Sequence, residues 1–189
     1  MIHKIIEEHI ETAQKLLLQE TEILAICNAC WNAIYKGNKI FLAGNGGSAA
    51  DAQHIAAELI GRFTTERRAL PALALTTDTS VLTSVGNDYG FENIFSRQIE
   101  AFAQAEDIFI AISTSGTSKN IIKAVEAAQL KKVKTIGFLG YSGGTLKNMV
   151  DLPLVISSNN TARIQEMHIL VGHIVCAFID EKIVNNFNG

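Results

Sequence analysis

Five short apolar segments, alternating with amphipathic stretches, constrain the fold of this chain more than any other feature of its sequence. They cover residues 39–43, 71–75, 107–112, 134–139 and 152–156. Helical patterns separate or follow them, at residues 48–60, in pieces over 79–104, and at 118–131, about 143–149 and 160–184. Short strands that are apolar on both faces and alternate with helices are typical of a buried parallel sheet. With right-handed crossovers, we expect an α/β fold with a three-layer, doubly wound, five-stranded parallel sheet.

The region before the first strand, residues 3–36, has apolar residues at three- and four-residue steps and contains neither Gly nor Pro. This pattern predicts one long helix or two, ended by Gly37-Asn38. A five-stranded sandwich offers these helices no obvious place, so we expect an N-terminal helical extension, residues 1–36, that contributes to contacts between chains. No linker or repeat divides the sequence, and residues 1–189 are expected to form a single domain.

The charge balance excludes several classes of protein. The chain has 16 Lys and Arg against 19 Asp and Glu, a net charge of −3 and no basic block, so no nucleic-acid partner is expected. No apolar run reaches the roughly 20 residues of a membrane helix, and no signal-type segment is found, so we expect a cytoplasmic protein without membrane contact. The cysteines do not suggest a disulfide framework, and Cys27 and Cys30 are expected to be buried thiols.

The first strand leads into a glycine-rich loop, Gly44-Asn-Gly-Gly-Ser-Ala-Ala-Asp51. The positions of Gly44, Gly46 and Ala49 nearly satisfy the dinucleotide fingerprint. Glycines permit a tight turn, and the helix that follows offers free N–H groups to an anion. The loop alone fits a nicotinamide cofactor, a phosphosugar or merely a cramped turn. Since the chain has little room for a second substrate region, and Asp78 lies too far from the loop, we expect no nucleotide cofactor.

The third strand ends in a hydroxyl-rich loop, Ser113-Thr-Ser-Gly-Thr-Ser118, and a helical run follows from Ile121. Hydroxyl groups and helix N–H groups together can bind the oxygens of a phosphate. An alternative is that Thr117 or Ser118 merely caps the helix, but one hydroxyl would suffice for that. Five hydroxyl residues in six positions favour an anion site.

Two pairs of polar side chains lie at helical spacing. His54 and Glu58 are one turn apart on the helix after the first strand, and Gln165 and His173 share a side of the last helix. Together these groups can bind a metal such as zinc, or they can transfer protons. The structural alternative for His54 and Glu58 is an ordinary ion pair on the surface.

Two further residues of the last helix, Glu166 and His168, are alternatives to Gln165 and His173 for metal binding or proton transfer. Spacing alone does not choose between the two pairs. The histidines near the start of the chain have no such pattern around them. His3 and His9 lie on a polar helix start, so we expect both to be solvated.

Taken together, these motifs resemble those of a known family. The resemblance rests on five segments in order: Gly44-Asn-Gly-Gly-Ser48, His54 to Phe63, Val85-Gly-Asn-Asp-Tyr-Gly-Phe91, Ser113 to Ser118, and Arg163-Ile-Gln-Glu-Met-His168 with His173. The sequence is similar to the phosphoheptose isomerases, which belong to the sugar-isomerase (SIS) superfamily. The resemblance covers nearly the whole chain, including the N-terminal helices.

The resemblance implies an aldose–ketose isomerase that interconverts D-sedoheptulose 7-phosphate and D-glycero-D-manno-heptose 7-phosphate through an enediolate. It implies a place in bacterial heptose synthesis, for lipopolysaccharide core or capsule. It also implies a homotetramer with sites at subunit boundaries and a zinc ion. In such an assembly, His54 and Glu58 can meet a Gln165 and His173 pair from another chain.

Site residues follow from the same resemblance. Glu58 would be the base and His173 its acid/base partner, with Arg62 and Asp88 as weaker orienting groups. The metal residues would be His54, Glu58, Gln165 and His173. Substrate contacts would fall on Asn45, Gly46, Gly47, Ser48, Glu58, Asn87, Asp88, Ser113, Thr114, Ser115, Ser118 and Gln165.

A second member of the superfamily offers an alternative function. The segments Arg163 to His168 and Thr65-Glu-Arg67 equally resemble the replication-initiator-associating protein, a non-catalytic adaptor on the same fold. That branch lacks the carboxylate of the first crossover helix and the final histidine. Because this chain has both Glu58 and His173, the enzyme is the favoured interpretation.

Overall fold

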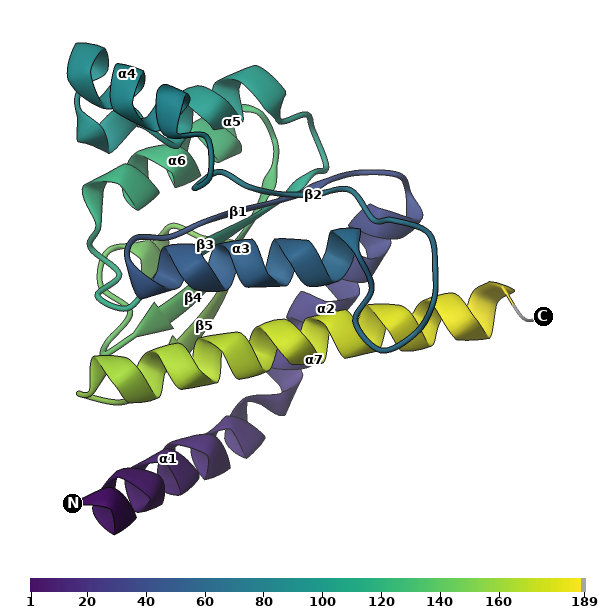
Figure 1. Ribbon diagram of the computed structural model, residues 1–189, viewed down its shortest axis with the longest axis vertical. Coiled ribbons are helices and arrows are strands. Elements are labelled where there is room, and N and C mark those ends of the chain that lie inside the picture. The colour runs from purple at the N-terminus through teal and green to yellow at the C-terminus, as the bar shows by residue number, and fades with distance from the viewer. Residues whose placement is uncertain (188–189) are drawn as a thin grey trace.

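The computed structural model describes residues 1–187, and these residues form an α/β sandwich (Figure 1). The strands are β1 (Ile40–Ala43), β2 (Ala72–Ala74), β3 (Ile108–Ser113), β4 (Lys134–Gly140) and β5 (Leu152–Ile156). The helices are α1 (Ile2–Leu16), α2 (Glu20–Tyr35), α3 (Gly47–Ile60), α4 (Thr79–Tyr89), α5 (Ser96–Phe102), α6 (Lys119–Leu130) and α7 (Thr161–Phe187). Short 3₁₀ turns occur at η1 (Leu17–Gln19), η2 (Phe91–Asn93) and η3 (Leu146–Asn148).

The sheet confirms the predicted fold class. Its strands are all parallel and follow the order β2-β1-β3-β4-β5. Ile40 of β1 lies opposite Ala72 of β2 on one side and Ile108 of β3 on the other, so β1 and β3 are neighbours in the sheet. Every residue of β1 and β3 is buried, as expected for a sheet that helices cover on both faces.

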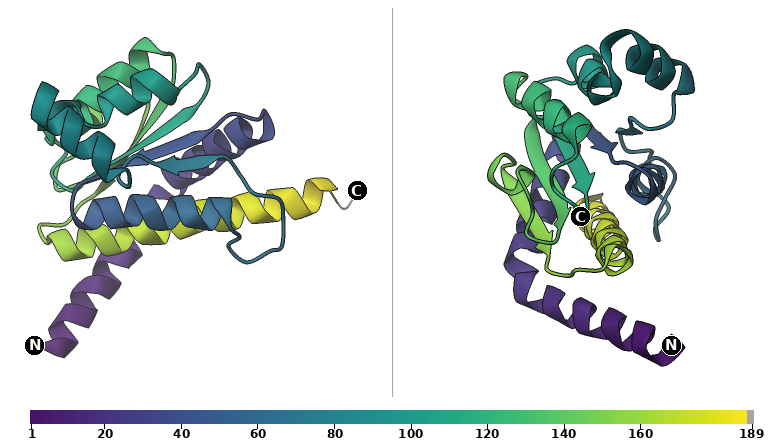
Figure 2. Two further views of the ribbon diagram at one scale, coloured as in Figure 1. Left: turned by 45° about the horizontal axis from the view of Figure 1, so that its top comes forward. Right: turned by 90° about the vertical axis from the view of Figure 1, so that its left-hand side faces the viewer.

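Two hydrophobic cores lie on the two faces of this sheet. Ile40 and Leu42 point into a core with α2, α3 and α7, whereas Phe41 and Ala43 point into a core with α5 and α6. This alternation follows from the two-residue period of a strand. Figure 2 shows the resulting three layers from two further sides.

The N-terminal region differs from its prediction in one respect. It forms two helices joined by η1, and α2 packs on the sheet, where Ile26 and Ile34 are almost fully buried. The expectation that this region has no place in the sandwich is therefore wrong for α2. α1 extends away from the sandwich (Figure 1, Figure 2), and its Ile6 and Ile10 are 53% and 48% exposed. Its contribution to contacts between chains stays a prediction.

The helix expected at about residues 143–149 is another correction, because only the turn η3 forms there. Gly143 and Gly144 both adopt positive φ, at 87° and 53°, which is incompatible with a right-handed helix. The cysteine prediction is confirmed, since Cys27 and Cys30 are buried. Burial raises the pKa of Cys27 to about 11, so this thiol stays protonated at neutral pH. No helix among the described residues is long and apolar enough to cross a membrane.

A buried histidine anchors α7 to the sheet. His168 is fully buried, and its Nε2 donates to the carbonyl oxygen of Leu139 in β4 at 3.0 Å. Its Nδ1 is buried and has no hydrogen-bond partner among residues 1–187. Burial lowers the pKa of His168 to about 4, and the bond to Leu139 only partly opposes this shift. The ring is therefore neutral in the folded protein at neutral pH.

This histidine should make the protein sensitive to acid. Between pH 6.5 and 4 the unfolded chain binds a proton at residue 168 that the folded chain does not, so the free energy of unfolding should fall as pH falls. A shift of this size corresponds to about 3 kcal/mol over the whole range. His168→Gln keeps a neutral donor but does not titrate, so its unfolding free energy should fall less steeply in urea titrations across these pH values. The exposed His3 is the control, and His3→Gln should keep the wild-type slope. An unchanged slope in His168→Gln would contradict this account.

Candidate active site

The candidate site lies where the connections that follow two neighbouring strands go to opposite faces of the sheet. β1 leads to α3 on one face, and its neighbour β3 leads to α6 on the other face (Figure 1). In a sheet of this strand order, such divergence opens a crevice beyond the carboxyl ends of the two strands. The glycine-rich loop at 44–48 and the hydroxyl-rich loop at 113–118 both lie at this point.

The glycine-rich loop owes its shape to glycines that no other residue can replace without movement. Gly46 has a φ of 56°, in the left-handed region. A Cβ on Gly44 would collide with the carbonyl group of Ser48, and one on Gly47 would collide with the side-chain amide of Gln165. No side chain caps the start of α3 at Gly46. A helix start without a side-chain cap can offer backbone N–H groups to an anionic ligand.

The hydroxyl-rich loop is held by its own hydroxyl groups. The Oγ atoms of Ser113 and Ser118 lie 3.1 Å apart, and the N–H groups of Gly116 and Thr117 donate to Ser113 and Ser115. Ser118 occupies the N-cap position of α6 but makes no capping hydrogen bond with its side chain. The hydroxyl of Thr117 donates to Ser115 Oγ at 3.1 Å. The alternative that Thr117 or Ser118 merely caps the helix is therefore wrong.

A second loop supports the hydroxyl-rich loop from behind. Gly116 has a φ of 67°, and a Cβ there would collide with the carbonyl oxygen of Gly143. The N–H of Leu146 donates to the carbonyl oxygen of Gly116 at 3.0 Å. The backbone after β4 thus fixes the position of the hydroxyl groups.

The ionisable side chains meet between α3 and α7 of the same chain. His54 Nε2 lies 3.1 Å from Glu58 Oε1 and 3.3 Å from His173 Nε2. The ring of Phe63 stacks on His173, with the ring centroids 5.4 Å apart. His54 is half exposed, and Glu58 is more buried, with 26% of its side chain accessible. An imidazole and a carboxylate, both accessible and from two helices, are suited to proton transfer.

The fourth predicted metal residue lies apart from this group. The amide of Gln165 lies against Gly47, at the start of α3. Gln165 precedes His173 by eight residues, which is about 12 Å along a helix axis. Among residues 1–187, no three His, Cys, Asp or Glu side chains form a group with metal-site geometry. The structure thus brings three of the four residues together and places Gln165 nearer the glycine-rich loop.

Comparison with known proteins decides the family. Residues 5–140 match the SIS domain family. The chain is 53% identical over 182 residues to the phosphoheptose isomerase of Nitratiruptor sp., an alignment that covers 96% of this chain and 97% of that protein. The corresponding enzyme of Sulfurimonas denitrificans is 52% identical over 179 residues, covering 94% and 90%. The chain belongs to the phosphoheptose isomerase family.

Solved structures of the same family match the fold closely. The phosphoheptose isomerase from Neisseria gonorrhoeae superposes with a TM-score of 0.90 at 40% identity, covering 95% of this chain and 97% of that one. The enzyme from Francisella tularensis gives a TM-score of 0.92 at 39% identity, covering 95% and 96%. The relatives at 52–53% identity and these two structures at 39–40% identity are all named phosphoheptose isomerases, which favours the enzyme over the adaptor.

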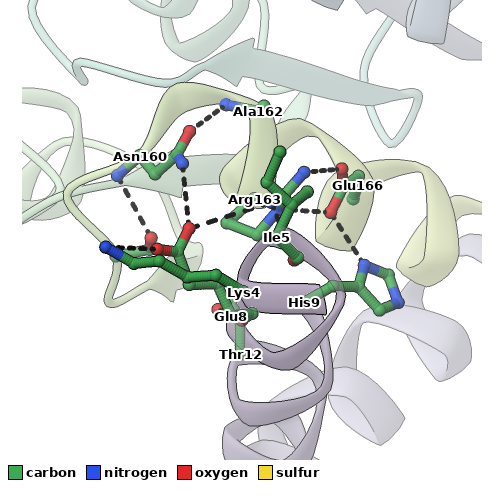
Figure 3. Close-up of polar contacts among 10 residues, drawn as sticks. Lys4, Ile5, Glu8, His9, Thr12, Asn160, Ala162, Arg163 and Glu166 are labelled. Carbon is green, nitrogen blue, oxygen red and sulfur yellow. Dashed lines mark hydrogen bonds and ion pairs between the residues drawn. The ribbon is translucent and has the colours of Figure 1, made fainter. Parts of the chain in front are cut away.

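The structure also separates the two competitors on α7 from the site. Glu166 binds Arg163 and His9 instead, as Figure 3 shows, and His168 is buried against Leu139. The hydrogen bond from Arg163 lowers the pKa of Glu166, so this carboxylate stays charged in its network. The prediction that His9 is merely solvated is wrong, because its Nδ1 lies 2.7 Å from Glu166 Oε2 and links α1 to α7.

Three predicted residues, Asn87, Asp88 and Arg62, make no hydrogen bond or ion pair with the two loops or with the His54 group among the described residues. Asn87 donates to Asp88 at 2.7 Å, and both lie on the exposed face of α4. Arg62 lies near Glu66 in an exposed ion pair at 3.6 Å. Thr114 and Ser115, by contrast, lie within the hydroxyl-rich loop itself, half-buried and exposed respectively.

Sequence reasoning missed a buried ion pair that fastens the site. Arg67 and Asp180 are each 2% exposed and lie 2.7 Å apart, and Arg67 also donates to the carbonyl oxygen of Glu58 at 2.9 Å. Asp180 accepts the N–H groups of Thr64 and Thr65. The pair joins the end of α3 to α7 at a separation of 113 residues, and no local pattern could have revealed it.

A second missed residue is Asp51, one turn before His54 on α3. Its Oδ2 is buried and has no hydrogen-bond partner in the part of the chain that the structure describes. Burial raises its pKa to about 6, although the nearby His54 partly opposes the shift. The i, i+3 spacing to His54 was a signal for Asp51 that the sequence did contain.

Proposed function

We propose that this protein is an aldose–ketose isomerase that converts D-sedoheptulose 7-phosphate into D-glycero-D-manno-heptose 7-phosphate. The observation that carries the proposal is the meeting of Glu58, His54 and His173 between α3 and α7, at distances of 3.1 and 3.3 Å. The glycine-rich loop and the hydroxyl-rich loop at the crevice beyond β1 and β3 support a phosphorylated sugar as the substrate. Relatives that are 52–53% identical to this chain carry the name of this enzyme.

The chemistry assigns a role to each of two side chains. The Glu58 carboxylate takes a proton from C1 of the ketose, and the C–H electron pair becomes the double bond of an enediolate with its charge on O2. Glu58 then returns the proton to C2, while His173 moves a proton between O1 and O2, so that the aldehyde forms at C1. A carboxylate suits the carbon acid, and an imidazole suits the oxygens because its ordinary pKa lies near neutrality.

The phosphate end of the substrate serves orientation. Ser113, Ser115 and Ser118 offer hydroxyl donors, and the start of α6 adds backbone N–H groups. Binding a dianion far from the reacting carbons holds C1 and C2 in place for proton transfer. The loop contains no lysine or arginine, so hydroxyl and backbone donors carry this interaction.

Zinc is part of the proposal because two imidazoles and a carboxylate are ligand types that suit it. Zinc–ligand bonds of about 2.0–2.1 Å in a tetrahedron put neighbouring ligand atoms roughly 3.3–3.4 Å apart. The two separations around His54 Nε2, 3.3 Å to His173 and 3.1 Å to Glu58, are close to that spacing. His54, Glu58 and His173 would hold the ion. Gln165 lies against Gly47, about 12 Å along α7 from His173, so its assignment as the fourth ligand rests on the resemblance alone. Bound zinc would act as a Lewis acid on the substrate oxygens.

Further parts of the proposal concern assembly and cellular role. We propose a single domain that forms a homotetramer, which the exposed isoleucines of α1 support. We also propose a cytoplasmic enzyme of bacterial heptose synthesis, which supplies lipopolysaccharide core or capsule. No observation favours a second function, since Glu58 and His173 are both present and adjacent to His54.

Glu58→Gln should lower kcat for sedoheptulose 7-phosphate by about 10²–10⁴-fold, since it replaces the base with a neutral group of the same shape. Affinity for the substrate, measured by calorimetry, should change little. Glu66→Gln is the control, because Glu66 is exposed and pairs only with Arg62 among the described residues. A residual rate within about tenfold of wild type would contradict the assignment, because tenfold is only about 1.4 kcal/mol of barrier.

The zinc proposal predicts that metal content depends on the His54 group. Purified protein should hold about one zinc ion per chain by elemental analysis, which fits one tetrahedral site. His54→Ala and His173→Ala should each lower this content strongly, whereas His3→Ala should leave it unchanged. Zinc content that is equal in all four proteins would rule out these ligands.

A further inference from the structure

Two asparagine side chains from different loops form a closed hydrogen-bonded pair at the candidate crevice. Asn45 Nδ2 donates to Asn120 Oδ1 at 2.9 Å, and Asn120 Nδ2 donates back to Asn45 Oδ1 at 2.8 Å. Asn120 is only 3% exposed, whereas Asn45 is exposed. A carboxamide has two N–H donors and two oxygen lone pairs. The pair therefore uses half of the hydrogen-bonding capacity of the Asn45 side chain.

The pair links the two loops that line the crevice. Asn45 follows β1, and Asn120 lies in the first turn of α6, just after β3. Because α3 and α6 pack on opposite faces of the sheet, the two chain segments diverge from this point. The two amides thus connect the glycine-rich loop directly to the start of the helix that follows the hydroxyl-rich loop.

Asn120 does not use its side chain within its own helix. Asparagines near a helix start commonly bond to neighbouring backbone groups. Here the Asn120 carboxamide makes two hydrogen bonds among the described residues, and both go to Asn45, which is 75 residues away. A buried amide is costly unless it is hydrogen-bonded. Asn45 satisfies this amide, and in return its own orientation is fixed.

We propose that Asn120 is a positioning residue for Asn45. With its plane fixed, the Asn45 carboxamide has one N–H and one oxygen lone pair left for a ligand. A sugar hydroxyl matches this pattern because it both donates and accepts, whereas the oxygens of a phosphate dianion only accept. Asn120 thus directs Asn45 to sugar hydroxyl groups, while the loop at 113–118 binds the phosphate. The inference rests on the proposed function, because it takes a phosphorylated sugar as the ligand.

A cycle of Asn45→Ala, Asn120→Ala and the double variant tests the proposal. Asn120→Ala should raise KM for sedoheptulose 7-phosphate about tenfold, since loss of two hydrogen bonds releases Asn45, and kcat should change less. In the Asn45→Ala background, the same substitution should have almost no effect, because the residue that it positions is already absent. Glu126→Ala, at an exposed position of α6, is the control and should leave KM unchanged.

Asn120→Asp tests whether residue 120 orients Asn45 by hydrogen bonding or merely fills the space beside it. Aspartate has nearly the same shape but offers two acceptors, so it keeps one hydrogen bond from Asn45 and faces the Asn45 oxygen with another oxygen. KM should therefore rise at least as much as in Asn120→Ala. If Asn120→Ala raises KM equally in both backgrounds, or if Asn120→Asp behaves as wild type, the proposal is wrong.

Unfolding of the free protein gives a readout that needs no substrate. The double variant should lose less unfolding free energy than the sum of the two single losses, since both single variants break the same pair. Additive losses would overturn the inference. If wild type neither converts nor binds sedoheptulose 7-phosphate, the proposed function fails, and the unfolding cycle still decides whether Asn120 holds Asn45.

Discussion

The close packing of α3 against α7 is the interaction on which the rest of the site depends. Gly172 makes this approach possible, because a Cβ there would lie 2.5 Å from the side chain of Ile55. Further along, the buried pair Arg67–Asp180 fastens the end of α3 to α7. A buried ion pair is costly to break because it leaves one charge unpaired, so this contact resists separation of the two helices. His54 and His173 meet because these helices are held together.

The same packing connects the two halves of the site. Gln165 of α7 touches Gly47, where the glycine-rich loop becomes α3, and His173 meets His54 two turns later. The start of α3 thus belongs to the crevice that can hold a phosphate, and its middle belongs to the group that can transfer protons. A phosphorylated sugar has this same division between an anionic end and a reacting end. The sheet order supplies the crevice, and the helix pair supplies the chemistry.

Much of this arrangement could be predicted from sequence, because the signals were local. The strands are apolar on both faces, which predicts a buried sheet. The glycines after β1 and the hydroxyl residues after β3 mark the two loops as candidate binding loops. The His54–Glu58 pair likewise follows from helical spacing. The helix predicted at 143–149 shows the limit of such patterns. Gly143 and Gly144 adopt positive φ and pack closely against Gly116 of the hydroxyl-rich loop, so no helix forms there.

The sequence could not predict which residues far apart in the chain would contact one another. Glu166 lies outside the site because it binds His9, which is 157 residues earlier in the chain. His168 lies outside it because its ring donates to a backbone carbonyl of β4. The pairs Asn45–Asn120 and Arg67–Asp180 also join positions far apart in the chain. Burial favours the contacts of His168, Asn120 and the Arg67–Asp180 pair, since most buried polar groups in folded proteins are hydrogen-bonded.

The central claim is that one chain supplies both Glu58 and His173 to the same site, and subunit mixing tests it most directly. Glu58→Gln and His173→Ala chains, each inactive, would be mixed, and exchange of subunits would be followed by native mass spectrometry of mass-tagged chains. The account predicts no recovery of sedoheptulose 7-phosphate isomerase activity, because no mixed assembly contains a chain with both residues. Recovered activity in exchanged assemblies would show that the two residues come from different chains and would contradict the account.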